Sequence, residues 1–110
     1  MKLLIVGSRG IDKFDLSPYI SDNVDVIISG GATGVDSLAE KYADEKNISK
    51  YIIRPKYKLY GKAAPLIRNE EMVNMSDAIL VVWDGKSRGT EHTIKYARKV
   101  NKECKVVIVT

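Results

Sequence analysis

The chain has 110 residues, which suits a single domain with one modest core and excludes a second domain. Hydrophobic residues make up 45% and charged residues 29%, an ordinary balance for a globular protein, and no apolar run is long enough to span a bilayer. The formal net charge of +4 suits anionic ligands but is too small to indicate nucleic-acid binding by itself. The strand-like start and the lone Cys104 predict a cytoplasmic domain without signal peptide, membrane contact or disulfide.

The apolar segments are continuous runs, a pattern that is typical of parallel strands covered on both faces. Between most of these runs, apolar residues recur at helical spacing. A short irregular segment lies around Ser17 and Pro18, and residues 55–62 are predicted to form the one long loop. The predicted strands are 3–6, 24–28, 51–53, 78–82 and 106–109, and the predicted helices are 33–47, 63–75 and 90–101.

This alternation predicts an α/β fold, a single Rossmann-like domain over residues 1–110 with an open parallel five-stranded sheet and helices on both faces. The expected strand order is 3-2-1-4-5. Such sheets bind ligands outside the carboxyl ends of their strands, where the strand order reverses. The loops after strands one, two and four would therefore converge on one crevice.

Those three loops, residues 7–10, 29–34 and 83–90, are rich in glycine and hydroxyl side chains, whereas the opposite edge has ordinary turn residues. The loop 29–34 is the most informative, because a strand, a glycine-rich turn and a helix together build a phosphate cradle. The alternative is a plain tight turn without a ligand. Thr33 and Asp36 match a capping box, and Asp36 either caps its helix or contacts a ligand hydroxyl.

Two common nucleotide-binding motifs are missing. Dinucleotide-binding folds have G-x-G-x-x-G after the first strand and an acidic residue at the end of the second. Here the glycine loop follows the second predicted strand, and the residue about twenty positions beyond it is Arg54. No Walker phosphate loop occurs either, so standard NAD-dehydrogenase and NTPase functions are excluded.

The ordered motifs, from residues 7–9 to the final strand, closely resemble the YspA-type members of the SLOG superfamily. This superfamily includes the DNA-processing SMF/DprA proteins and the Lonely-guy hydrolases. The resemblance implies a Rossmann-like domain that binds nucleotides, ADP-ribose relatives or, in DprA proteins, single-stranded DNA, and that occurs in bacteria or phages. The motifs are S-G-G-A-x-G-V-D (29–36), G-K-A-A (61–64), R-N-x-x-M (68–72), S-D (76–77) and W-D-G-K-S-x-G-T (83–90).

Lonely-guy hydrolases carry R-x-x-x-M, A-D and P-G-G-x-G-T-x-x-E, and use the arginine and the last glutamate to cleave an N-glycosidic bond. This chain matches at Arg68 and at Gly89 and Thr90, but Thr93 takes the place of the glutamate. A hydroxyl cannot replace a carboxylate in that cleavage. Glu91 lies about 200° from that position around the helix, so Asp84 is the better alternative carboxylate. Hydrolysis therefore ranks below binding.

The DprA branch reads S-G-x-A-x-G-I-D-x-x-A-H, often with an arginine in the loop. This chain has Thr33 in the loop and Glu40 at the histidine position. A carboxylate beside a phosphate backbone lowers affinity, because such binding is largely electrostatic. Single-stranded DNA, held by Arg9, Arg68, Lys86 and Arg88, is therefore the third hypothesis.

Several singled-out side chains also have structural interpretations. Helical geometry puts Arg68 on the far side of an apolar stripe, where it would be solvated, so its functional role comes from the resemblance alone. Asn69 needs a polar partner, from a ligand or from neighbouring side chains. Trp83 is expected in the core rather than stacked on a base. His92 has no second histidine or cysteine nearby, which predicts no metal site. The basic, aromatic segment 55–62 is either a solvated connection or a lid.

The sequence thus predicts a binding domain for a small nucleotide ligand, a nucleoside phosphate or an ADP-ribose-like compound, with no cofactor and with homo-oligomers as in related domains. The ribose phosphate is expected on residues 30–34 and a second anion on 87–90, with Asp36 or Asp84 accepting from ribose hydroxyls. Candidate catalytic residues are Arg68, Asp84 and Glu91. The expected ligand-binding residues are Gly7, Ser8, Arg9, Ser29, Gly30, Gly31, Ala32, Thr33, Gly34, Asp36, Arg68, Asn69, Asp84, Lys86, Ser87, Gly89 and Thr90.

Overall fold

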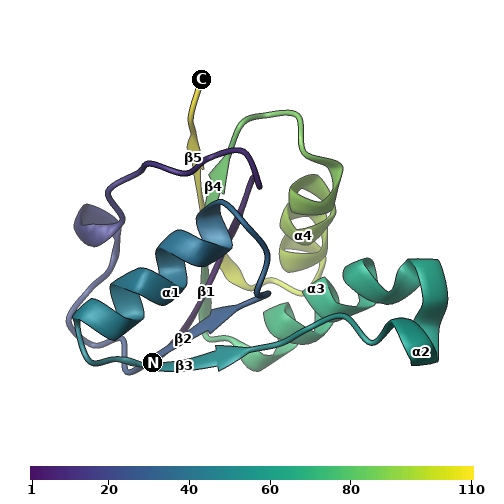
Figure 1. Cartoon of the computed structure of the whole chain (residues 1–110), viewed down its shortest axis with the longest axis horizontal. Helices are drawn as coiled ribbons and strands as arrows, with labels where there is room; N and C mark the ends of the chain where they lie inside the picture. Colours follow the sequence, from purple (N-terminus) through teal and green to yellow (C-terminus); the bar gives the residue numbers. More distant parts are fainter.

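The computed structural model describes all residues, 1–110, and consists of one parallel sheet with helices packed against it (Figure 1). The sheet order is β3-β2-β1-β4-β5, which confirms the predicted order and the α/β fold class. The strands are β1 (Lys2–Gly7), β2 (Val26–Ser29), β3 (Ser49–Ile52), β4 (Ala78–Trp83) and β5 (Glu103–Ile108). The longer helices are α1 (Val35–Glu45), α3 (Ala64–Met75) and α4 (Arg88–Lys99).

The two faces of the sheet hold separate apolar clusters, because successive side chains of a strand point to opposite faces. On one face, Leu3 and Ile5 of β1 pack with Val35 and Ala39 of α1. The segment between β1 and β2, which contains the short 3₁₀ helix η1 (Ser17–Tyr19), completes this cluster. On the other face, the remaining β1 side chains pack with α3 and α4, and Figure 1 shows α1 apart from that pair. Helices therefore cover both faces, as predicted.

Both edge strands begin earlier than the apolar runs indicate. β3 starts at Ser49 rather than at Tyr51, and β5 starts at Glu103 rather than at Val106. Edge strands expose their side chains, so polar residues join the ladder through their backbone groups alone. Cys104, which precedes the predicted strand 106–109, consequently lies within β5 and pairs in register with Ile79.

The segment 55–62 is not the structureless loop that was predicted. It contains a one-turn helix, α2 (Tyr57–Tyr60), and a 3₁₀ turn, η2 (Gly61–Ala63), that leads directly into α3. In Figure 1 this part of the chain projects from the body of the molecule beside α3. The sequence pattern does not predict α2, because this helix has no buried residue and hence no apolar periodicity. None of the helices has the length and hydropathy needed to cross a membrane.

Candidate functional site

Ser8 connects the carboxyl ends of β1 and β4. Its side chain is almost fully buried, and its Oγ accepts a hydrogen bond from the Asp84 amide at 2.9 Å and one from the Ser87 hydroxyl at 3.0 Å. Its carbonyl also accepts a hydrogen bond from the Val35 amide at the start of α1. Ser8 therefore fixes three segments at the edge of the sheet where the sequence predicts the crevice.

Gly34 is the residue that lets α1 start so close to β1. Its φ is +73°, and a Cβ atom there would lie 2.4 Å from the backbone oxygens of Ser8 and Arg9. Gly34 is also the N-cap of α1, and no side chain caps this helix. The predicted capping box is therefore wrong, because Thr33 is exposed and the chain turns into the helix one residue later.

The glycine loop after β2 uses much of its own backbone hydrogen-bonding capacity. The Gly31 amide donates to Ser29 Oγ at 3.3 Å, and the Ala32 amide donates to Asp36 Oδ2 at 3.1 Å. Ser29 Oγ in turn donates to Glu40 at 3.0 Å. These amides are consequently not available to a phosphate, and the loop is a less complete anion cradle than its sequence indicates.

Asp36 is a buried carboxylate with one oxygen in use. Oδ2 accepts from Ala32, whereas Oδ1 has no hydrogen-bond partner within the chain. Burial raises the pKa of this carboxyl, although the Ala32 hydrogen bond and the nearby Arg68 and Arg9 guanidinium groups oppose that effect. Asp36 lines the crevice described below, and its second oxygen can accept a hydrogen bond from a ligand there.

Arg68 is buried, and the prediction of a solvated side chain from helical geometry is wrong. Its Nη1 donates to the carbonyl oxygens of Gly30 at 2.7 Å and of Ile53 at 3.3 Å, and its Nε donates to Asn69 Oδ1 at 2.9 Å. The long side chain reaches the carboxyl ends of β2 and β3 from α3, which helical spacing alone does not predict. Burial lowers the pKa of the guanidinium, which the Asp36 carboxylate counteracts. Nη2 makes no hydrogen bond within the chain.

The amino end of α4 offers three consecutive free backbone donors, whereas the Gly31 and Ala32 amides of the glycine loop are in use. Ser87 is the N-cap, no side chain caps the helix, and the amides of Arg88, Gly89 and Thr90 have no acceptor within the chain. Asn69 reaches this turn from α3 and donates to the Gly89 carbonyl at 3.5 Å. The first amides of a helix and its dipole favour an anion.

Asp84 shapes the loop that leads into α4. Its Oδ1 accepts from the amides of Lys86 at 2.8 Å and Ser87 at 2.9 Å, and also from the Ser87 hydroxyl. These hydrogen bonds lower the pKa of Asp84 to about 2. Trp83 is only partly buried, and its Nε1 donates to the Ser87 carbonyl at 3.1 Å, so the indole closes the same loop.

These segments surround a crevice of about 290 Å³, near the lower end of the range for ligand pockets. It lies between the carboxyl ends of β1 and β2, the start of α4 and one side of α3. Its lining combines backbone, two arginines and one carboxylate with a small apolar wall. The lining residues are Val6, Gly7, Arg9, Gly10, Ala32, Asp36, Pro65, Leu66, Arg68, Asn69, Met72, Ser87, Gly89, Thr90 and Thr93.

Nine of the predicted ligand-binding residues line this crevice: Gly7, Arg9, Ala32, Asp36, Arg68, Asn69, Ser87, Gly89 and Thr90. Gly30, Gly31 and Thr33 lie instead around a second hollow on the other side of the glycine loop. Ser8, Ser29, Gly34, Asp84 and Lys86 line neither of these two spaces. Sequence reasoning missed the apolar wall of Pro65, Leu66 and Met72, since apolar side chains on a helix indicate core.

Two of the three candidate catalytic side chains lie outside the crevice. Glu91 is exposed and pairs with Lys95 at 3.3 Å, and Asp84 is held in its turn. Thr93, at the position of the hydrolase glutamate, lines the crevice and donates to the Gly89 carbonyl at 3.1 Å. His92 contacts Glu70 at 2.8 Å and so ties α4 to α3. Asp36 is thus the one carboxylate among the lining residues.

No family model matches the chain, and no solved structure matches it. Among curated proteins, the chain is similar to the Gene 61 protein of Mycobacterium phage D29. The two sequences are 33% identical, and the alignment covers 89% of each of them. The likeness therefore extends over nearly the whole domain, and it agrees with the expectation of a bacterial or phage protein.

Proposed function

The chain belongs to the same family as the Gene 61 protein of phage D29, and we propose that it binds a nucleotide or nucleotide derivative in the crevice. The observation that carries this proposal is the pairing of an uncapped helix start with a buried carboxylate that keeps one free oxygen. The uncapped start of α4 favours a phosphate, and the Asp36 carboxylate favours a sugar hydroxyl. We also propose that this family is a branch of the SLOG superfamily.

The phosphate would bind at the start of α4. The amides of Arg88, Gly89 and Thr90 are free donors, whereas the Ser87 hydroxyl is engaged with Ser8 and Asp84. Arg9 and Arg68 line the same space, and no carboxylate lies within ion-pair distance of either guanidinium. A phosphate there gains both the helix dipole and two positive charges that are not in ion pairs.

The other lining residues indicate where the sugar and the base of the ligand would lie. Asp36 Oδ1 is an acceptor, which is what a ribose hydroxyl requires of its partner. The base would lie against Pro65, Leu66 and Met72, the apolar wall that α3 contributes. A volume of about 290 Å³ suits a mononucleotide better than a dinucleotide.

A thermal-shift screen tests the proposal, with adenosine, guanosine, cytidine and uridine 5′-monophosphates and ADP-ribose as probes. A ligand at a hundredfold its dissociation constant adds about 2.7 kcal/mol to the free energy of unfolding, so Tm should rise by several degrees. Asp36→Asn, which keeps the shape of the side chain, should bind the same probe more weakly. A screen in which no probe raises Tm would overturn the proposal.

N-glycosidic hydrolysis is the second candidate function, and Asp36 favours it, since this carboxylate lines the crevice and burial raises its pKa. Water would split the bond between base and sugar to give free base and ribose phosphate. Glycoside hydrolysis commonly uses two carboxylates, and the crevice holds one, so binding without turnover is the better-supported function. Free base measured by chromatography should stay at background. Rapid release that Asp36→Asn abolishes and Asp84→Asn retains would replace binding with hydrolysis.

A further inference from the structure

A second space lies on the far side of the glycine loop, and we call it the arginine hollow. Its volume is about 300 Å³, similar to that of the crevice. None of its eight lining residues is acidic, and three are arginines: Arg9, Arg54 and Arg68. Arg9, Ala32 and Arg68 line both spaces, so the crevice and the arginine hollow adjoin each other along these residues.

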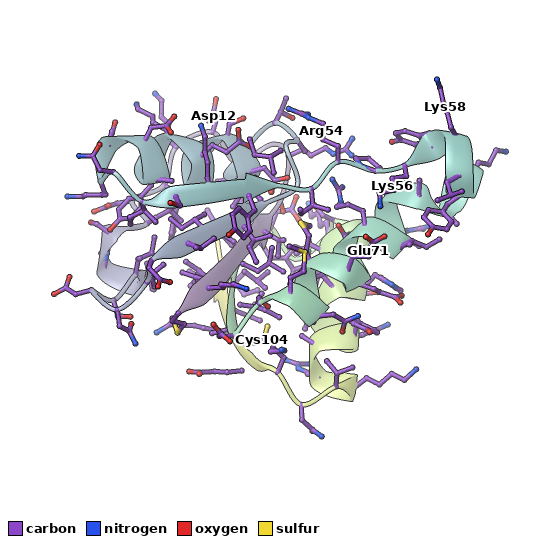
Figure 2. All side chains as sticks on the ribbon, turned by 90° about the horizontal axis from the view of Figure 1, so that it is seen from below. Asp12, Arg54, Lys56, Lys58, Glu71 and Cys104 are labelled. Atoms are coloured by element: carbon purple, nitrogen blue, oxygen red, sulfur yellow. The ribbon has the colours of Figure 1, made fainter.

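Arg54 is held over the glycine loop by the end of β3. The Ile53 amide donates to the Ser29 carbonyl at 2.8 Å, which extends the pairing of β2 with β3 up to Arg54. Arg54 Nη1 then donates weakly to the Gly31 carbonyl at 3.4 Å. A Cβ atom on Gly31 would lie 2.8 Å from this nitrogen, so glycine is what lets the guanidinium lie against the loop. Figure 2 shows Arg54 on the segment that leaves β3 toward α2.

The arginines of this hollow are not in ion pairs, although the Asp36 carboxylate lies near Arg9 and Arg68. The chain has six ion pairs, and none of them includes an arginine. Lys56, two residues further on, pairs instead with Glu71 of α3 at 4.0 Å (Figure 2). In dinucleotide-binding folds, the residue at the end of the strand beside the glycine loop accepts from ribose hydroxyls when it is acidic, whereas an arginine there accommodates an extra phosphate.

We propose that the arginine hollow binds a second phosphoryl group of the same ligand, with Arg54 as its own cation and with Arg9, which lines both spaces, between the two phosphates. This inference rests on the proposed function, because the first phosphate occupies the start of α4. The preferred ligand is then a nucleotide with phosphates on two sides of its sugar, such as a nucleoside bisphosphate. A single 5′-phosphate would fill the crevice and leave Arg54 unused.

Isothermal titration calorimetry with three probes tests this inference: adenosine 5′-monophosphate, adenosine 3′,5′-bisphosphate and adenosine 2′,5′-bisphosphate. We expect one bisphosphate to bind at least about tenfold more tightly than the monophosphate, the size of effect that a charge-assisted hydrogen bond supplies. Arg54→Gln should remove that advantage and leave monophosphate affinity unchanged. Lys58→Gln is the matched control, since Lys58 points away from the body of the molecule at α2 (Figure 2) and should leave all three affinities unchanged.

The outcomes separate this inference from the function on which it rests. If the monophosphate binds and neither bisphosphate binds more tightly, the second phosphate site is wrong and the nucleotide crevice stands. If Arg54→Gln weakens monophosphate and bisphosphates equally, Arg54 serves the first phosphate and the inference is also wrong. If none of the three adenosine probes binds while another nucleoside monophosphate raises Tm, the bisphosphates of that nucleoside must bind more tightly than its monophosphate, and equal affinity overturns the second phosphate site. If no nucleotide binds at all, both proposals are overturned.

Discussion

Asp36 is held where its negative charge destabilises the unliganded protein. Burial raises its pKa above the ordinary value of 3.8, so ionisation costs stability as the pH rises through the folded-state pKa. Such a cost is typical of residues kept for function. Asp36 therefore offers a test that is independent of any ligand.

We predict that Asp36→Asn raises Tm at pH 7, because asparagine accepts the Ala32 hydrogen bond without carrying a charge. The gain should shrink as the pH falls below about 4, where the aspartic acid is protonated in both states. Calorimetric melts at pH 7 and pH 3.5 measure the difference. Asp22→Asn, an exposed aspartate, is the control and should change neither melt. A lower Tm for Asp36→Asn at pH 7 would contradict this account.

Asp84 should behave in the opposite way. Hydrogen bonds from Lys86 and Ser87 hold its pKa at about 2, so its ionised form stabilises the fold above the ordinary value of 3.8. That contribution is lost as the pH falls from about 4 to 2. We predict a lower Tm for Asp84→Asn at pH 7 and little difference from the wild type near pH 2. Denaturation curves across this range check the prediction, and an unchanged Tm at pH 7 would show that the carboxylate does not stabilise the turn.

At the scale of the element, the start of α4 carries the proposed phosphate site. Gly89 lies there with no atom closer than 3.9 Å to the position of a Cβ atom, and its φ is not positive. The fold therefore does not require glycine at this position. Because glycine has no side chain, a phosphate can instead approach the neighbouring amides closely.

We predict that Gly89→Ala stabilises the unliganded protein by about 0.4–1 kcal/mol, because alanine reduces the conformational entropy of the unfolded chain. The same methyl group would occupy space beside the free amides and weaken nucleoside monophosphate binding. Chemical denaturation and calorimetric titration measure the two effects, and their opposite signs exclude loss of fold as the cause. Wild-type affinity in Gly89→Ala would place the phosphate elsewhere.

At the scale of the whole molecule, the sequence was sufficient for the sheet order, because continuous apolar runs and the positions of glycine loops depend on local patterns. The starts of β3 and β5 could not be predicted, since residues such as Ser49 and Glu103 join the ladder through backbone groups. Seven of the nine predicted residues in the crevice lie at strand ends or just after them, whereas Arg68 and Asn69 lie on α3 and were predicted from the family resemblance. Contacts made by long side chains across elements, such as Arg68 with Gly30 and Ile53, have no local signature.

Which loop keeps unpaired backbone amides also could not be predicted. The sequence of the glycine loop predicts a phosphate cradle, but the amides of Gly31 and Ala32 donate hydrogen bonds to the side chains of Ser29 and Asp36. Three free donors lie in the first turn of α4, a part of the site that the sequence ranks second. Which amides remain free depends on side chains that fold back onto the loop, and only the assembled site reveals this.

An NMR titration of the uniformly ¹⁵N-labelled protein tests the nucleotide crevice most directly, with the nucleoside monophosphate that gives the largest thermal shift as ligand. We predict saturable shifts in the amide resonances of Arg88, Gly89 and Thr90, the three free donors at the start of α4. The amide of Asn47, at the opposite edge of the sheet, should stay unchanged. Absence of any shift, or shifts confined to the edge near Asn47, would contradict the account.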